Sequence, residues 1–172
     1  MMSSPYYLPQ AEDKYEYITK EGIDVSGLLA RSHHPKAGAI VLFSGEVRDN
    51  NAGKDVSWLE YEAQVFIASK MIKEILDRAT KDWGLQIAVA QHRIGKVEVG
   101  ESAVVVITAS SHRKEAYSAN RFIIDKIKHE VPIWKCEVFK DGSKEWGNNC
   151  NCHSITGSID KHIYETSFDE KK

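Results

Sequence analysis

Two uninterrupted apolar runs, residues 39–43 and 103–107, most constrain the fold of this chain. Apolar runs of this length between polar segments are typical of strands that are buried on both faces. The sequence therefore predicts such a strand within residues 38–48 and a second one at residues 104–108. Neither run approaches the roughly 20 residues that a membrane-spanning helix requires, so we expect no passage through a bilayer.

Two longer segments carry the pattern of amphipathic helices. Apolar residues recur at steps of three and four from Ala68 to Ala79, and Gly84 is suited to end that helix. A second helix is expected over residues 112–130, because it has an apolar stripe of its own and Pro132 follows its end.

The remaining segments predict the other strands of a sheet and the turns between them. We expect strands at residues 15–19, 56–61, 87–94 and 133–139, a short helix after the capping Asp24, and turns at residues 49–55, 95–101 and 141–143. Strands follow one another directly as well as alternating with helices, which indicates an α+β fold. The sheet is expected to be mixed or antiparallel and packed by two main helices, with a small additional subdomain. A single domain over residues 15–152 would lie between a flexible leader, 1–14, and a flexible tail, 153–172.

The charge balance and the cysteine content exclude several classes of protein. Lys and Arg total 23 against 25 Asp and Glu, a formal net charge of −2, so the chain is not a polycation built for nucleic acid. Three cysteines do not make a disulfide framework, which favours a reducing compartment. The first residues resemble neither a secretory signal nor an arginine-rich transit peptide, and we expect a cytoplasmic protein.

Basic residues gather around the second helix and the strand after it, and two of them begin the helix. His112 and Arg113 follow a buried strand at a helix N-terminus, where unpaired N–H groups make a site suited to phosphate. Arg48 ends the first buried strand, directly after Glu46 and Val47, and would stand at the sheet edge. The alternatives are a capping or packing role for His112 and a surface ion pair for Arg48.

Two lysines flank Pro132, at which the second helix gives way to a strand. Lys128 lies in the last turn of the helix, and Lys135 lies in the strand. If their ammonium groups were about 5 Å apart at an effective dielectric constant of about 20, their repulsion would be roughly 3 kcal/mol, or about two pKa units. A lysine whose pKa is lowered so far can act as an acid, a base or a nucleophile near neutral pH. The alternative is that both side chains point to water and never meet.

Cys150, Cys152 and His153 raise the question of a metal site. A structural zinc site needs two ligand pairs at set spacing, whereas this segment has one pair of cysteines with a single residue between them and an adjoining histidine. We therefore expect no metal, and the role of the cluster stays open. The Walker-type loop and the Gly-x-Gly-x-x-Gly and His-Glu-x-x-His motifs do not occur, which removes the commonest nucleotide-binding and zinc-protease classes.

Four segments in register resemble the large, catalytic subunit of molybdopterin synthase. They are residues 38–48, His92-Arg93-Ile94-Gly95 with Val99-Gly100-Glu101, Ser111-His112-Arg113, and Lys128 with Val131-Pro132-Ile133-Trp134-Lys135. Their order and spacing match that family over about residues 38–146. One segment alone would be a weak signal, whereas four in register are a strong one.

The resemblance implies an enzyme, a sulfurtransferase of molybdenum cofactor biosynthesis, without a cofactor of its own. Members of that family move sulfur twice onto cyclic pyranopterin monophosphate and so form the dithiolene of molybdopterin. The sulfur arrives as a thiocarboxylate on the Gly-Gly tail of a small ubiquitin-like partner, and this tail threads into a pocket of the large subunit. Two large subunits form a central dimer with a small subunit at each end, so the resemblance implies a homodimer within a heterotetramer.

The resemblance also implies roles for particular residues. Lys128 and Lys135 would be catalytic, with Lys128 closest to the incoming carboxyl terminus. The pyranopterin would be bound by Glu46, Val47, Arg48, His112, Arg113, Lys128, Lys135, Cys136 and Glu137. We do not expect Cys136 to carry sulfur, because the sulfur comes from the partner.

One departure from the family pattern and two competing interpretations remain. The family often has an arginine after the tryptophan that corresponds to Trp146, and this arginine reaches the neighbouring subunit's site. Residues 147–150 contain no basic residue, and Lys144 is our candidate for that role. A non-catalytic scaffold that docks a ubiquitin-like protein is one alternative. An RNA-binding module is another, although the aromatic-rich sheet motif that stacks bases is missing.

Overall fold

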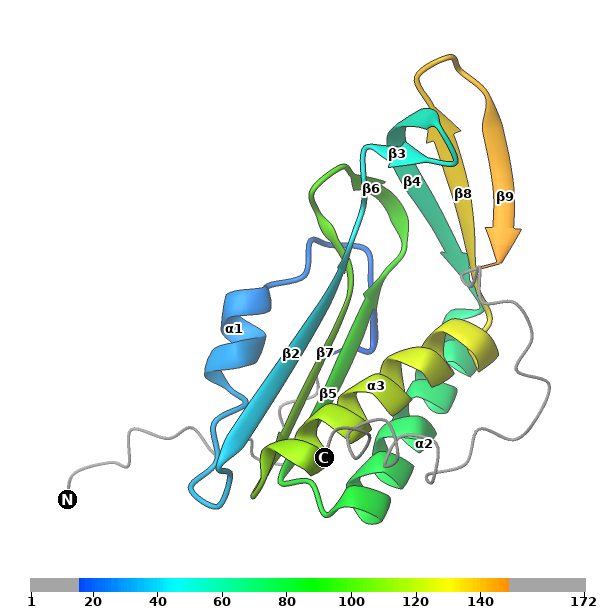
Figure 1. Ribbon diagram of the computed structural model, residues 1–172. Coiled ribbons are helices and arrows are strands. Elements are labelled where there is room, and N and C mark those ends of the chain that lie inside the picture. Colours follow the sequence, from blue (N-terminus) through cyan, green and yellow to red (C-terminus); the bar gives the residue numbers. More distant parts are fainter. Residues whose placement is uncertain (1–15, 149–172) are drawn as a thin grey trace, which may run out of the picture.

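The computed structural model describes residues 16–148, which form three helices and nine strands (Figure 1). In chain order they are β1 Ile18–Thr19, α1 Val25–Ala30, β2 Ala39–Glu46, β3 Asn50–Asn51, β4 Lys54–Ala63, α2 Val65–Trp83, β5 Ile87–Arg93, β6 Gly95–Glu98, β7 Ser102–Ser110, α3 Arg113–Glu130, β8 Ile133–Phe139 and β9 Lys144–Asn148. The cluster of Cys150, Cys152 and His153 lies outside the described residues, as do the expected leader and tail. The domain boundaries therefore stay predictions.

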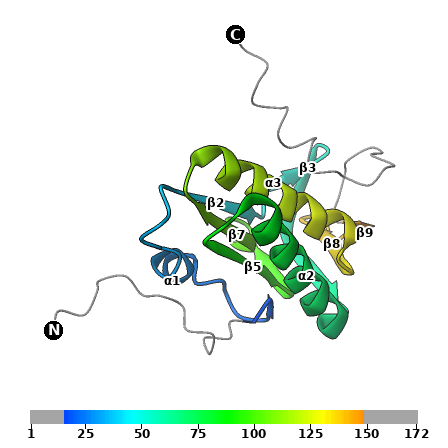
Figure 2. The ribbon, with the colours of Figure 1, turned by 90° about the horizontal axis from the view of Figure 1, so that it is seen from below.

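The first sheet has four strands in the order β1-β5-β7-β2 and is mixed. The strand β7 is central: it pairs antiparallel with β2 on one side and with β5 on the other, while β1 runs parallel to β5. Helices α2 and α3 cover one face of this sheet, and α1 lies on the other face (Figure 2). Residues 103–110 of β7 are all buried, as the second apolar run predicted.

Both long helices bury the apolar stripes that their periodicity indicated. In α2, Ala68, Ile72 and Ala79 are fully buried, and α3 packs its own stripe against β7 and β2. The helix α2 ends at Gly84, whose φ of 61° is a left-handed conformation that glycine adopts without strain. No helix within residues 16–148 is long and apolar enough to cross a membrane.

A second sheet forms the additional subdomain. Its strands run in the order β3-β4-β8-β9, and β6 also pairs with β4. The pairing is antiparallel, so that Cys136 of β8 lies between Glu60 of β4 and Trp146 of β9. Because Pro132 follows α3 directly, the last turn of α3 lies next to this sheet (Figure 1). The predicted α+β fold with two main helices and a small subdomain is confirmed.

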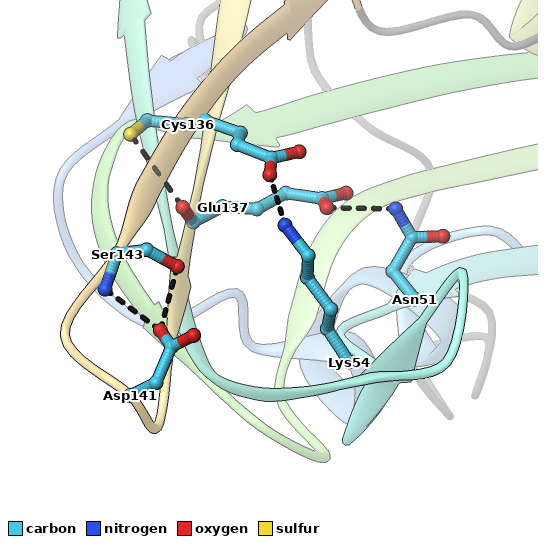
Figure 3. Close-up of polar contacts among 7 residues, drawn as sticks. Asn51, Lys54, Cys136, Glu137, Asp141 and Ser143 are labelled. Carbon is cyan, nitrogen blue, oxygen red and sulfur yellow. Dashed lines mark hydrogen bonds and ion pairs between the residues drawn. The ribbon is translucent and has the colours of Figure 1, made fainter.

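The turn between β8 and β9 is closed by a side chain. The Asp141 carboxylate accepts hydrogen bonds from the Ser143 backbone N–H at 2.8 Å and from its hydroxyl at 2.6 Å (Figure 3). An aspartate that bonds the backbone two residues on is a common turn device, which is why the sequence predicted a turn at residues 141–143.

The structure differs from the sequence-based prediction in four places. Residues 50 and 51 were predicted as part of a turn but form β3, which pairs with β4. Residues 95–98 were predicted as part of a turn but form β6, because they pair with residues 58–61 of β4. The strand β9 was not predicted, because its own sequence has no apolar period. It is a strand because it pairs with β8. The strand β2 is not buried on both faces, because it lies at the edge of the sheet and Leu42 is 37% exposed.

Candidate active site

A cavity of about 160 Å³ lies where the end of α3 meets the two sheets. Its charged and amide side chains are Glu46, Arg48, Asn50, Asn51, Lys128, Lys135 and Glu137. Its uncharged lining consists of Gly45, Val56, Leu59, Tyr61, His92, Ala103 and Val104. Most of the uncharged residues are buried, whereas Glu46, Arg48, Asn50 and Lys128 are exposed. The cavity therefore has a charged mouth above a floor that is mostly uncharged but includes the buried Glu137.

The structure brings the two lysines that flank Pro132 into this one cavity. Lys128 comes from the last turn of α3, and Lys135 comes from β8. The break in the helix at Pro132 lets the chain reverse within a few residues, so that both side chains reach the same space.

Glu137 holds Lys135 in place. Lys135 Nζ donates a hydrogen bond of 2.7 Å to Glu137 Oε1. Asn51 Nδ2 donates one of 2.7 Å to Glu137 Oε2 (Figure 3). Burial on its own would raise the pKa of Glu137. The hydrogen bonds from Lys135 and Asn51, together with the charges of Lys135 and Arg48, outweigh it and hold that pKa below its ordinary value. Glu137 is therefore a carboxylate at neutral pH.

Lys128 has no partner of opposite charge within hydrogen-bond or ion-pair distance among residues 16–148. Its pKa lies below the ordinary value for lysine, chiefly because the ammonium is partly desolvated at the cavity. The positive charges of Lys135 and Arg48 lower this pKa further, and Asp125 opposes them. The sequence-based argument attributed the shift to repulsion between the lysines alone. In the structure burial is the larger cause, and the positive charge of Lys135 comes second.

Four residues of the expected binding set do not line the cavity, and two of them, Val47 and Cys136, are buried away from it. Val47 is 3% exposed and packs in the main core, while Glu46 and Arg48 on either side of it reach the cavity. Cys136 is 1% exposed and lies between Lys135 and Glu137, so the alternation of side chains along β8 turns it to the other face. Burial is the main cause that raises the pKa of its thiol, which keeps the thiol protonated and unreactive.

His112 and Arg113 stand at the opposite end of α3 from Lys128. Fifteen residues of helix separate Arg113 from Lys128, a rise of about 22 Å at 1.5 Å per residue. Neither residue lines the cavity of its own chain. His112 precedes α3 with an extended backbone, and its side chain makes no capping hydrogen bond. A single copy of the chain therefore does not bring His112 and Arg113 together with Lys128.

Four polar side chains of the cavity, Asn50, Asn51, Tyr61 and His92, were absent from the expected set. Asn50 and Asn51 were recognised only as part of a turn-rich loop, and Tyr61 and His92 only as residues of strands or of a motif. Their position depends on how distant strands pair, which no local pattern reveals. The part of the chain that the structure describes holds no group of three or more His, Cys, Asp or Glu residues placed to bind a metal.

Comparison with known proteins places this fold in a family. The family model of the MoaE protein matches residues 18–130. The molybdopterin synthase catalytic subunit of Thermoplasma volcanium is 41% identical over 132 residues, which cover 77% of this chain and 96% of that protein. The X-ray crystal structure of molybdopterin synthase from Staphylococcus aureus matches with a TM-score of 0.72 and 36% identity, over 76% of this chain and 95% of that one.

A more distant structure shares the fold alone. It comes from the complex of subunits 1 and 2 of the molybdopterin-converting factor of Helicobacter pylori 26695. The match has a TM-score of 0.61 at 22% identity and covers 76% of this chain and 88% of that one.

These relatives define the class of protein: the chain is an enzyme subunit of the kind named molybdopterin synthase catalytic subunit. It belongs to the MoaE family. The family, the fold class and the enzyme class that the sequence predicted are confirmed. The roles of individual residues at the cavity remain proposals.

Proposed function

We propose that this chain transfers sulfur from the thiocarboxylated C-terminus of a small ubiquitin-like partner to cyclic pyranopterin monophosphate, and so forms the dithiolene of molybdopterin. The observation that carries the proposal is the cavity in which Lys128 and Lys135 stand beside Arg48, in a chain of the MoaE family. A phosphate and a thiocarboxylate are both anions, and a cavity lined by the cations Arg48, Lys128 and Lys135 suits them.

The two lysines are suited to different tasks. Lys128 has a lowered pKa and no counter-ion among the described residues, so it exchanges a proton more readily than an ordinary lysine. Lys135 is held by Glu137 and suits a fixed positive charge that stabilises negative charge as sulfur is transferred. Arg48 is exposed at the mouth, which suits it to the phosphate of the pyranopterin.

His112 and Arg113 are proposed to bind the pyranopterin from a second copy of the chain. The length of α3 keeps them about 22 Å from Lys128 of the same chain, so one copy cannot use all of these residues on one substrate. The strand β2 supports a homodimer, because it is an edge strand with an exposed apolar residue, Leu42. Lys144 on β9 is exposed and remains the candidate for the missing basic residue of the family.

The tail of the partner is proposed to enter the same cavity, with its carboxyl terminus beside Lys128. The Thermoplasma volcanium relative is named as a catalytic subunit, which supports an assembly with a second kind of subunit. A heterotetramer of two copies of this chain and two small subunits is the assembly that we expect. The cytoplasmic location expected from the sparse cysteines stays a prediction.

Turnover by the purified chain tests this proposal. The chain is incubated with pyranopterin and a thiocarboxylated partner, and molybdopterin is measured by mass spectrometry. A partner that ends in an unmodified Gly-Gly carboxylate serves as the control and should give no product. Binding of the thiocarboxylated partner and of the pyranopterin without any product would contradict the proposal and favour the non-catalytic scaffold.

A further inference from the structure

His92 is a titratable side chain of the cavity to which the proposed reaction gives no role. It lies in β5, is 3% exposed, and lines the same space as Lys128. The pKa of His92 is lowered to about 4, mainly by burial. The contact with the Arg93 backbone raises this pKa, and the positive charge of Lys128 lowers it further. The imidazole is therefore neutral at neutral pH.

The backbone selects one tautomer of this neutral ring. His92 Nδ1 lies 2.7 Å from the carbonyl oxygen of Arg93. A carbonyl oxygen only accepts, so Nδ1 carries the hydrogen and Nε2 is left with a free lone pair. Within residues 16–148, Nε2 makes no hydrogen bond, and it is not fully buried. Nε2 is thus the ring nitrogen free to accept a hydrogen bond, and the ring that carries it lines the cavity.

The ring is also fixed in orientation. The rings of His92 and Tyr61 meet edge to face, with centroids 5.0 Å apart and an angle of 72° between their planes. Burial is the main cause that raises the pKa of Tyr61 to about 12, and the charge of Glu137 adds to it, so the phenol stays protonated. The titratable groups that act on the imidazole are Tyr61 from β4 and Lys128 from α3, while Arg93 contacts it through its backbone carbonyl. No described carboxylate bonds to it.

The surroundings of His92 indicate what kind of group it receives. The buried floor of the cavity is formed mainly by apolar side chains from β4 and β7, namely Val56, Leu59, Ala103 and Val104. Such a floor suits a flat heteroaromatic ring, while the cations at the mouth suit a phosphate. A carboxylate in place of His92 would add a negative charge to the cavity that Lys128 lines. A neutral imidazole offers a hydrogen-bond acceptor without taking up the charge of the lysine.

We propose that His92 is a specificity-determining residue whose Nε2 accepts a hydrogen bond from a ring N–H of the bound pyranopterin. This inference rests on the proposed function, because it takes the pyranopterin as the ligand. It assigns the charged mouth to the phosphate and the mostly uncharged floor, with His92 as its acceptor, to the pterin ring.

A pair of matched variants separates the two nitrogens of the ring. The amide nitrogen of Asn in His92→Asn reproduces the Nδ1 donor to Arg93 but leaves nothing at the position of Nε2. The longer amide of Gln in His92→Gln reaches the position of Nε2 with an acceptor oxygen. We expect the Kd for pyranopterin to rise about tenfold in His92→Asn and clearly less in His92→Gln, since one hydrogen bond is at stake. The Kd for the partner should stay unchanged in both.

Nitrogen NMR on the unmodified complex gives a second readout that needs no substitution. With ¹⁵N-labelled histidine, addition of pyranopterin should shift the Nε2 resonance of His92 and leave Nδ1 nearly unmoved. An unshifted Nε2, or a Kd in His92→Asn equal to that of the wild type, would overturn the inference. If the wild-type protein makes molybdopterin and yet gives these results, only the role of His92 fails. Absence of turnover by the wild type is instead a failure of the proposed function.

Discussion

Lys135 Nζ lies 2.7 Å from Glu137 Oε1, two residues further along the same face of β8. This ion pair stands beside Lys128, which has no such partner among the described residues. The cavity therefore contains one lysine whose charge is fixed by a carboxylate and one whose proton is held less firmly. That difference is the physical basis for giving the two lysines different roles in sulfur transfer.

Replacing Lys128 should nearly abolish sulfur transfer. Lys128→Ala is expected to lower the rate by about 10²–10⁴-fold, the range for loss of a proton-transferring group, and to leave the fold intact because the residue is exposed. Lys128→Arg keeps the positive charge but cannot release a proton near neutral pH, so it should be almost as inactive. Single-turnover rates and thermal unfolding of the three proteins check this. Near-normal rates for Lys128→Arg would show that only the charge matters.

The pKa of Lys128 should rise when its charged neighbour is removed. The positive charge of Lys135 disfavours the ammonium form of Lys128, so Lys135→Met moves the pKa of Lys128 upward. Burial remains the main cause of the shift, and the pKa should therefore stay below the ordinary value for lysine. A titration followed by the ¹³Cε resonance of Lys128 measures both values. A pKa that falls or does not move in Lys135→Met would contradict the arrangement described above.

Mixed dimers test whether Arg113 serves the cavity of a second copy. Lys128→Ala and Arg113→Ala should each be nearly inactive alone. If each site takes Lys128 from one copy and Arg113 from the other, random mixing restores about a quarter of the wild-type activity, because half of the dimers are mixed and each has one intact site. Activity that stays at the level of the separate variants after subunit exchange would show that both residues act within one chain.

Gly38 should not tolerate a side chain. A Cβ atom at Gly38 would lie 2.4 Å from the backbone oxygen of Ser111, and the Gly38 N–H donates a hydrogen bond of 2.9 Å to Ser110. Gly38→Ala is expected to lower the free energy of unfolding by about 1–3 kcal/mol, as overpacking does. Gly22→Ala is the matched control, because nothing lies within 4 Å of its Cβ position. Urea unfolding of both variants measures the difference, and equal stabilities would contradict the close approach.

Buried His92 should make the protein less stable in mild acid. The unfolded chain binds a proton at this histidine below its ordinary pKa of 6.5, whereas the folded chain does so only near pH 4. The stability that neutral His92 provides is therefore complete above pH 6.5 and is lost as the pH falls toward 4. Between pH 6.5 and pH 5 the loss is roughly 2 kcal/mol. His92→Gln should lose less stability over this interval by about that amount in urea unfolding, and an equal loss would place the folded pKa near its ordinary value.

Those parts of the fold that depend on short-range pattern were predictable from the sequence. The helices α2 and α3 carry a helical period with suitable ends at Gly84 and Pro132, and β7 carries an apolar run that only a buried strand explains. The strands β6 and β9 were missed because their partners, β4 and β8, lie elsewhere in the chain and impose the strand conformation on them.

In the candidate site, too, the residues placed by a local pattern were predicted, and those placed by sheet pairing were not. Lys128 and Lys135 were found because Pro132 between them makes the chain reverse locally. Asn51 and His92 were not included in the expected site, because they enter the cavity from other strands whose placement only the pairing of the sheets determines. The resemblance to a family grouped His112 with Lys128, whereas the straight helix between them keeps them apart in one chain.

The alternation of side chains along β8 limits how this segment can change in length. A single extra residue inside the strand would exchange the faces of Lys135 and Glu137 with those of Trp134 and Cys136, and would empty the cavity of its ion pair. The turn at residues 140–143 lies beyond the last cavity residue and can lengthen without changing this register. Insertions and deletions in natural variants of this chain should therefore collect in the hairpin turn and be absent from the seven residues before it.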